Sequence, residues 1–90
     1  MSDEPIQIPI DGVLDLHTFR PEETADVVEE YLLACLEKGI RQVRIIHGKG
    51  KGVQRRIVHS LLQRLKYVSS YRGAEGTAGG WGATIVNLKE

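Results

Sequence analysis

An aspartate and a histidine stand two residues apart in the segment LDLH (residues 14–17), and a second histidine opens the segment HGKGKG (residues 47–52). An imidazole can accept or donate a proton near neutral pH, and a neighbouring carboxylate can orient the ring and stabilise its charged form. Glycines allow backbone N–H groups to approach a phosphate, and lysines between them add positive charge. These residue types indicate acid/base chemistry at a phosphate, with Asp15, His17 and His47 as candidate catalytic residues. Asp15 could equally have only a structural role, as an acceptor for a backbone N–H of the loop.

Candidate phosphate contacts surround the second histidine. The glycine loop leads into a predicted helix, whose first N–H groups lack partners within the helix and carry the positive end of its dipole. Arg55 and Arg56 are either an ordinary solvated face of that helix or contacts to a phosphate backbone. Trp81 could stack on an unpaired base or cap the edge of a sheet. The candidate binding residues are Gly48, Lys49, Gly50, Lys51, Gly52, Arg55, Arg56 and Trp81.

Other kinds of site fit the sequence less well. Asp15, His17 and His47 could ligate a divalent metal such as Mg²⁺, but the chain has no HxxxH, no cysteine pair and no acidic cluster of the two-metal kind. The glycine loop lacks the order GxxxxGK[ST] of a P-loop and is not a dinucleotide fingerprint. A small-molecule phosphate enzyme would suit the loop, but a small two-layer domain offers only a shallow cleft. We predict no metal ligands and no required cofactor, and leave open whether a divalent metal takes part.

The length and the distribution of charge limit the partner. A chain of 90 residues holds about one small domain, since such a chain buries only roughly 60% of its unfolded surface. The net charge is zero, but residues 1–40 carry ten acidic against two basic residues, and residues 41–90 carry ten basic against two acidic residues. A basic half permits a nucleic-acid partner. No stretch approaches the roughly 20 apolar residues of a membrane span, and the N-terminus is acidic where a signal peptide would be basic.

The elements that position these residues alternate between strand and helix patterns. Strands are predicted over 13–16, 42–46, 67–71 and 83–88, and helices over 20–39 and 53–66. Residues 1–10 are expected to form a flexible tail before one domain at 11–90. The first helix is predicted to bury Ala25, Val28, Leu32, Cys35 and Leu36. The sole cysteine excludes an internal disulfide, and a reduced, buried thiol suits a cytoplasmic protein.

The order β-α-β-α-β-β predicts a two-layer α/β sandwich with a mixed sheet, in which two right-handed crossovers place both helices on one face. The first two strands should be parallel, so that their carboxyl ends share the edge where open α/β sheets usually bind ligands. The strand period of two places Asp15 and His17 together, and His47 ends the second strand at the same edge. His59 lies on the polar side of the second helix, where we expect it to be solvated.

Three motifs in this order, LDLH at residues 14–17, HGKGKG at 47–52 and GGWGAT at 79–84, resemble the Smr (small MutS-related) domain over residues 11–89. The resemblance implies a two-layer fold similar to the C-terminal domain of bacterial translation initiation factor 3. It also implies nucleic-acid endonuclease activity, because the family contains DNA-nicking domains of MutS-related proteins and enzymes that cut mRNA at stalled ribosomes. At matching positions it implies functional roles for Asp15, His17, His47, Gly48, Gly50, Gly79, Gly80 and Gly82.

The chain departs from the family pattern at Thr18, where the family usually has glycine. A bulkier residue there could narrow the cleft or re-aim His17. We predict a nucleic-acid-binding domain that acts as an endonuclease in ribosome rescue or DNA repair, as a monomer without a membrane partner. RNA is favoured over DNA, because an adjacent 2′-hydroxyl could be the nucleophile and would remove the need for a metal. The alternative is a non-catalytic module that docks on RNA, DNA or a ribosome.

Overall fold

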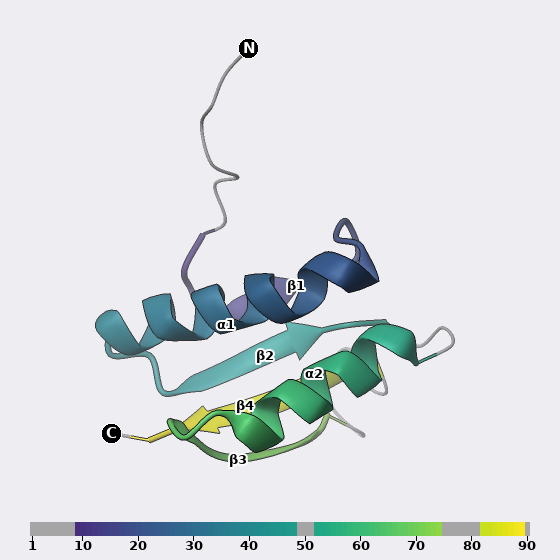
Figure 1. Cartoon of the computed structure of the whole chain (residues 1–90). Helices are drawn as coiled ribbons and strands as arrows, with labels where there is room; N and C mark the ends of the chain where they lie inside the picture. The colour runs from purple at the N-terminus through teal and green to yellow at the C-terminus, as the bar shows by residue number, and fades with distance from the viewer. Residues whose placement is uncertain (1–8, 49–51, 75–81, 90) are drawn as a thin grey trace.

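The chain folds in the predicted order of strands and helices. A computed structural model describes residues 9–48, 52–74 and 82–89. Its elements are β1 (Val13–Asp15), α1 (Pro21–Glu37), β2 (Gln42–Ile46), α2 (Val53–Arg64), β3 (Val68–Gly73) and β4 (Ala83–Leu88). The strands form one sheet in the order β1-β2-β4-β3, and both helices lie on the same face of it (Figure 1). The predicted two-layer α/β fold with a mixed sheet is confirmed.

The pairing of the strands brings the ends of β1 and β2 together. These two strands are parallel, as predicted, with Asp15 opposite Ile46. β4 is inserted antiparallel to both β2 and β3, so that β2 and β3 point the same way. The predicted bounds of β3 are wrong, because β3 continues to Gly73, which pairs with Thr84. A glycine carries no strand signal of its own, and here the pairing with β4 extends the strand.

The core lies between the helices and the sheet. In α1 the prediction is right for Val28, Leu32 and Cys35, which are buried, whereas Ala25 and Leu36 are only half-buried. Two polar residues of α1 that the prediction left out are also buried, because each has a hydrogen-bond partner. The Tyr31 hydroxyl accepts from the N–H of Gly12 (3.1 Å), and the Thr24 hydroxyl donates to the carbonyl of Arg20 (3.0 Å). These bonds tie α1 to the start of β1 and to the turn before the helix.

The two faces of the sheet carry different side chains. Val43 and Ile45 of β2 belong to the main core under the helices, whereas Ile46 packs against a second, smaller buried cluster. That cluster consists of Ala74, Ala83 and Ile85. The alternation follows the strand period of two, and Asp15 lies in the same row as Ile46. Asp15 therefore projects from the face that neither helix covers.

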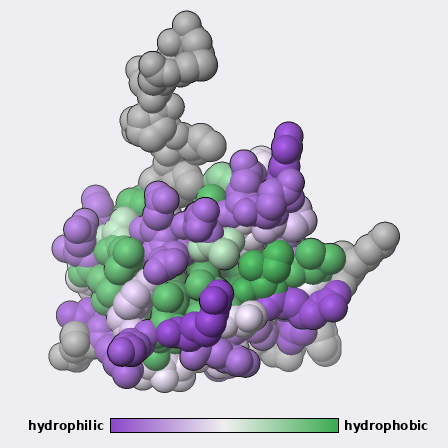
Figure 2. Space-filling model, in the orientation of Figure 1, coloured by the Kyte–Doolittle hydropathy of each residue, from purple (hydrophilic) through white to green (hydrophobic). Residues whose placement is uncertain are grey.

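The opposite charges of the two halves of the chain become a division between the helices. α1 contains six acidic and no basic residues, and α2 contains three arginines and no acidic residue. Viewed from the helix side, the molecule shows hydrophilic residues over the outer surface of both helices and hydrophobic residues between them (Figure 2). An anionic partner is repelled by the surface of α1 and attracted to that of α2.

Candidate active site

Asp15 and His17 form a hydrogen-bonded pair at the carboxyl end of β1. Leu14 and Leu16 are buried in the core, and the residues that alternate with them are exposed. The Nδ1 atom of His17 lies 2.9 Å from Oδ1 of Asp15, and the backbone N–H of His17 donates to the same oxygen at 3.0 Å. The side chain of His17 is 75% exposed and that of Asp15 is 47% exposed. The predicted pair thus exists, with its imidazole open to solvent.

The arrangement of this pair fixes the state of its two groups. The hydrogen bond from the backbone N–H of His17 lowers the pKa of Asp15, so that the carboxylate stays ionised. An ionised carboxylate can only accept hydrogen bonds, so the neutral His17 ring carries its proton on Nδ1. Within the described residues, no group bonds to Nε2 of His17. That nitrogen is left with a lone pair directed away from Asp15, as an acid/base group requires.

Gln54, near the start of α2, holds the turn that carries His17. Its Nε2 atom lies 2.8 Å from the carbonyl oxygen of Phe19, 3.3 Å from that of Leu16 and 3.2 Å from Oγ1 of Thr24. The N–H of Phe19 also donates to the carbonyl of Leu16 (3.0 Å), which closes a four-residue turn around His17. Sequence reasoning missed Gln54, because its partners lie 30 to 38 positions away along the chain.

Thr18 fits this turn without backbone strain. In the part of the chain that the structure describes, no residue other than glycine has a positive φ. Position 18 therefore does not use the left-handed conformation that favours glycine. Thr18 is exposed, and His17 beside it keeps its contact with Asp15. The departure from the family pattern is accommodated locally.

The two glycine-rich segments are joined where the structure describes their ends. The carbonyl of Gly82 accepts hydrogen bonds from the N–H groups of His47 (2.8 Å) and Gly48 (2.9 Å). In the first segment, Gly48 and Gly52 have φ angles of +84° and +78°, a conformation that other residues rarely adopt. The remaining predicted contacts of these segments, Lys49, Gly50, Lys51, Gly79, Gly80 and Trp81, lie outside the described residues.

His47 is buried, in contrast to His17. It is 7% exposed, its Nδ1 atom lies 3.1 Å from the carbonyl oxygen of Gly48, and its Nε2 atom lies 2.8 Å from Oγ1 of Thr84. The same Oγ1 atom lies 2.9 Å from Nε2 of His59. Thr84 therefore joins two imidazoles from different elements. We name this hydrogen-bonded set of His59, Thr84 and His47 the histidine chain.

The expectation that His59 is solvated is wrong. Its ring is half-buried, with its centroid 6.2 Å from that of His47 and 5.0 Å from that of Tyr71. The hydroxyl of Tyr71 in turn accepts from Nε2 of Gln63 (3.0 Å). Sequence reasoning missed Thr84 and Tyr71 as well, because both read as ordinary strand residues. Only the position of β4 between β2 and β3 brings them under α2.

Burial favours the neutral form of both rings of the histidine chain. Desolvation lowers the pKa of His47 and of His59 below the ordinary value of 6.5, and the nearby positive charge of Arg55 lowers both further. Arg55 and Arg56 are exposed in the first turn of α2, which contains no acidic residue. Their charges add to the positive end of the helix dipole. The start of α2 is thus a positively charged surface beside the glycine loop.

Both histidine groups lie at the same edge of the sheet but on different sides of it. Asp15 pairs with Ile46, and the N–H of Leu16 donates to the carbonyl of Ile46 (2.8 Å), so the two strand ends are adjacent. His47 contacts His59 of α2 and therefore faces the helix layer. His17, bound to Asp15, lies on the open side. The edge predicted from the sequence gathers all three candidate catalytic residues without making them one cluster.

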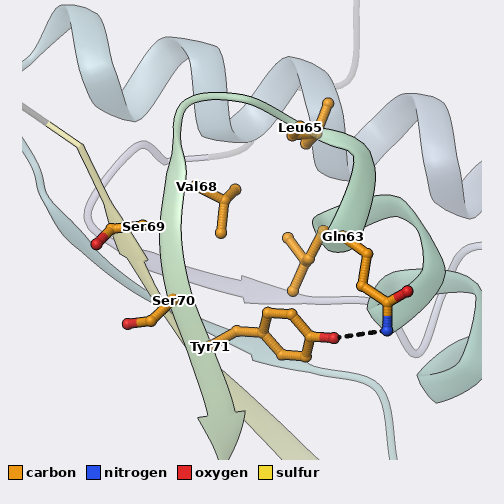
Figure 3. Close-up of a pocket in the computed structure, with 7 residues that line it drawn as sticks. Gln63, Leu65, Val68, Ser69, Ser70 and Tyr71 are labelled. Atoms are coloured by element: carbon orange, nitrogen blue, oxygen red, sulfur yellow. Dashed lines mark hydrogen bonds between the residues drawn. The ribbon is translucent and has the colours of Figure 1, made fainter.

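A pocket of about 380 Å³ opens between the end of α2 and β3 (Figure 3). Its walls are Leu62, Gln63, Leu65, Val68, Ser69, Ser70 and Tyr71. None of the predicted site residues lines it. Of its lining residues, Tyr71 packs against His59 of the histidine chain. The ring of Tyr71 points from β3 toward Gln63, as the dashed bond in Figure 3 shows.

Two further features concern metals and membranes. In residues 9–48, 52–74 and 82–89, no three side chains of His, Cys, Asp or Glu are grouped so as to hold a metal ion. Asp15 and His17 are each other's partners, and both nitrogens of His47 contact protein oxygens. Over the same described ranges, no helix is both long and apolar enough to cross a bilayer.

Solved structures share this fold and this arrangement of elements. The crystal structure of the Smr domain of Thermus thermophilus MutS2 superposes with a TM-score of 0.82 at 32% identity, covering 87% of this chain and 98% of that one. YdaL, a stand-alone small MutS-related protein from Escherichia coli, gives a TM-score of 0.83 at 31% identity, covering 94% and 70%.

Sequence comparison also finds relatives among MutS2 proteins. Endonuclease MutS2 of Lactobacillus gasseri is 46% identical over 76 residues, and that of Halothermothrix orenii is 39% identical over 80 residues. These matches cover 84% and 89% of this chain, which spans 10% of the length of each of these curated relatives. A family model described as the Smr domain matches residues 14–89. Because this match covers most of its length, the chain belongs to the Smr domain family.

Proposed function

We propose that the chain is an endonuclease in which His17 transfers a proton and Asp15 orients the His17 ring. The observation that carries the proposal is the 2.9 Å contact from Nδ1 of His17 to the ionised Asp15, on a ring that is 75% exposed. A carboxylate on Nδ1 fixes the tautomer and stabilises the imidazolium when Nε2 takes up a proton. His17 is thus prepared to act as a general base toward a substrate that approaches from solvent.

RNA is the substrate that this single acid/base pair suits best. Nε2 of His17 would remove the proton of a 2′-hydroxyl, whose oxygen then attacks the adjacent phosphorus. The O2′–P bond forms as the P–O5′ bond breaks, and a proton from water completes the 5′-hydroxyl product. The other product carries a 2′,3′-cyclic phosphate. DNA lacks the 2′-hydroxyl and would need a separately activated water molecule.

The start of α2 and the glycine loop would bind the phosphate. Gly48 and Gly52 have the φ angles that let a loop close on an anion, and Arg55 and Arg56 add charge at the helix end. We include Lys49 and Lys51 in this role as proposed contacts. Backbone N–H groups and guanidinium groups aimed at the phosphate would stabilise the additional charge of the transition state.

A second candidate function is docking on RNA, DNA or a ribosome without cleavage. It is favoured by the state of His47, whose two ring nitrogens both contact protein oxygens. His17 is then the one exposed imidazole among the described residues. Efficient attack of a 2′-hydroxyl on phosphorus usually employs a general base for the nucleophile and a general acid for the leaving oxygen. Here water would have to act as the acid. The relatives named endonuclease MutS2 support the nuclease.

The deciding experiment compares cleavage and binding by the wild type and by Asp15→Ala/His17→Ala. Labelled single-stranded RNA, duplex DNA and branched DNA are incubated with Mg²⁺ or with EDTA. Asp26→Ala, which removes an exposed carboxylate from α1, serves as the matched control. The nuclease proposal expects cleavage to disappear in the double variant while binding persists, and expects Asp26→Ala to behave as wild type.

The products identify the substrate. A 2′,3′-cyclic phosphate, together with resistance of RNA that carries 2′-deoxyribose at the cleavage site, would support the RNA mechanism. Cleavage of branched DNA alone would exclude it. Salt-sensitive binding with no cleavage by either protein would leave the docking module.

A further inference from the structure

The histidine chain has a direction that its acceptors impose. The carbonyl oxygen of Gly48 can only accept, so Nδ1 of His47, 3.1 Å away, carries the ring proton. In a neutral ring, Nε2 of His47 is then an acceptor, and the Thr84 hydroxyl donates a hydrogen bond to it at 2.8 Å. The Thr84 oxygen, its own proton used, accepts from Nε2–H of His59 at 2.9 Å. Protons therefore point from His59 through Thr84 to His47 and on to Gly48.

We propose that Thr84 and His59 are positioning residues that hold His47 in its Nδ1–H tautomer, so that His47 anchors the glycine loop instead of transferring protons. The loop's role in binding phosphate rests on the function proposed above, whereas the state of the rings does not depend on it. Because Nε2 and Nδ1 of His47 both have partners and the ring is 7% exposed, the ring has no free nitrogen for a substrate.

The histidine chain connects both ends of the glycine loop. His47 directly precedes the loop, and His59 lies about two turns into the helix that follows it. Thr84, which is fully buried in β4, bonds to both rings. A single hydroxyl thus fixes the end of β2 relative to α2. The spacing between those two elements is the span that the loop must bridge.

Gly48 receives a second restraint from the same place. Its N–H donates to the carbonyl of Gly82 at 2.9 Å, while its own carbonyl accepts from the ring of His47. Both polar groups of its backbone are therefore held. A loop that begins from a fixed residue presents its later N–H groups to an anion with less loss of conformational freedom.

The groups that face the histidine chain keep it neutral. Arg55 approaches both rings from α2, and Tyr71 of β3 packs against His59 with its ring. Among the described residues, no carboxylate contacts either ring. A proton on either ring would add charge beside Arg55. On His47 it would also make Nε2 a donor and reverse its bond to Thr84. The neutral, ordered arrangement is the one that all of these contacts favour.

The test reads the ring nitrogens directly. Nitrogen-15 NMR of the imidazoles distinguishes the two tautomers of a neutral histidine and the protonated ring. We expect His47 as the Nδ1–H tautomer and His59 as the Nε2–H tautomer at pH 7.5. Thr84→Val keeps the shape but removes the hydroxyl, and should alter the signals of both rings. Thr84→Ser keeps the hydroxyl and should restore them.

Binding of a single-stranded RNA gives the functional reading. Thr84→Val should weaken its affinity by up to roughly tenfold, the amount that one hydrogen bond is worth, and Thr84→Ser should restore it. An Nε2–H tautomer or a protonated ring at His47 in the wild type would overturn the proposal, even if Thr84→Val failed to fold. Wild-type protein that neither cuts nor binds nucleic acid would end the proposed function, and the ring assignment would still be decided by the NMR spectra.

Discussion

The two histidines at the carboxyl edge of the sheet differ in exposure and in hydrogen bonding. His17 is largely exposed, bound through Nδ1 to an ionised carboxylate, with Nε2 left toward solvent. His47 is buried, has partners on both nitrogens and has a pKa lowered by desolvation. Under the proposed function, the His17 ring transfers a proton, whereas the His47 ring holds neighbouring segments together.

The difference follows from the parity of the strand. Leu14 and Leu16 point into the core. His17 directly follows Leu16, so the strand period of two directs His17 away from the core. His47 stands two positions after the buried Ile45, in the inward row. The two imidazoles therefore lie on different sides of the sheet, His17 with Asp15 on the open side and His47 against His59 of α2.

The largest effect that would test this contrast comes from removing each ring in turn. His17→Ala should slow cleavage by about 10²- to 10⁴-fold with little change in the free energy of unfolding, because the ring is exposed. His47→Ala should lower the free energy of unfolding by about 1–3 kcal/mol, since it leaves the buried Thr84 hydroxyl without its acceptor. Single-turnover cleavage and urea unfolding measure the two quantities. Equal losses of cleavage at unchanged stability would contradict the contrast.

Gln54 tests whether the turn, as well as the pair, matters. Gln54→Met removes the amide that bonds the carbonyls of Leu16 and Phe19, and Gln54→Glu places a carboxylate against those oxygens. Loss of such a hydrogen bond should lower kcat by up to about tenfold, more for the Glu variant, with KM nearly constant. Gln42→Met, at the far end of β2, is the matched control. A change in KM alone would mean that Gln54 does not position His17.

The histidine chain predicts how stability depends on pH. The folded-state pKa values of His47 and His59 lie below 6.5, whereas unfolded histidine titrates at about 6.5. Between these values the unfolded chain binds more protons, so the free energy of unfolding falls as pH drops from about 7.5 through 6.5 toward the folded pKa values. Urea unfolding over this range should show the fall, and His47→Gln/His59→Gln should flatten it.

Asp15 provides the control for that curve. Its pKa is lowered from 3.8, so its contribution to stability is lost only in a more acidic window, as pH falls through the folded value. Asp15→Asn should therefore leave the slope between about pH 5.5 and 7.5 intact. A flattened slope in Asp15→Asn would assign the dependence to the exposed pair instead of the histidine chain.

The smallest effect is expected at Thr18. Because position 18 does not have a positive φ, Thr18→Gly should change the cleavage rate by less than about twofold. The added freedom of the unfolded chain should lower the free energy of unfolding by about 0.4–1 kcal/mol. Cleavage and urea unfolding of this variant check both values. A large gain of cleavage in Thr18→Gly would show that threonine restrains His17.

Much of the fold could be predicted from the chain, and so could one half of the candidate site. The alternation of strand and helix patterns determined the element order, and with it the parallel pairing of β1 and β2. The segment LDLH determined the Asp15 and His17 pair, because both partners lie on one strand end and the two leucines mark the inward side. Local spacing is enough where both partners of a contact are close in sequence.

Only the tertiary structure decided the other half. Gln54 meets the turn of His17 across 35 and 38 positions, and Thr84 meets His47 and His59 across 37 and 25. The apolar Ile45 and Ile46 before His47 left its side of the strand undetermined by pattern. Its burial was decided when β4 paired with β2 and brought Thr84 under α2. Hydrogen bonds between distant segments depend on the order of strands in the sheet, which no local spacing encodes.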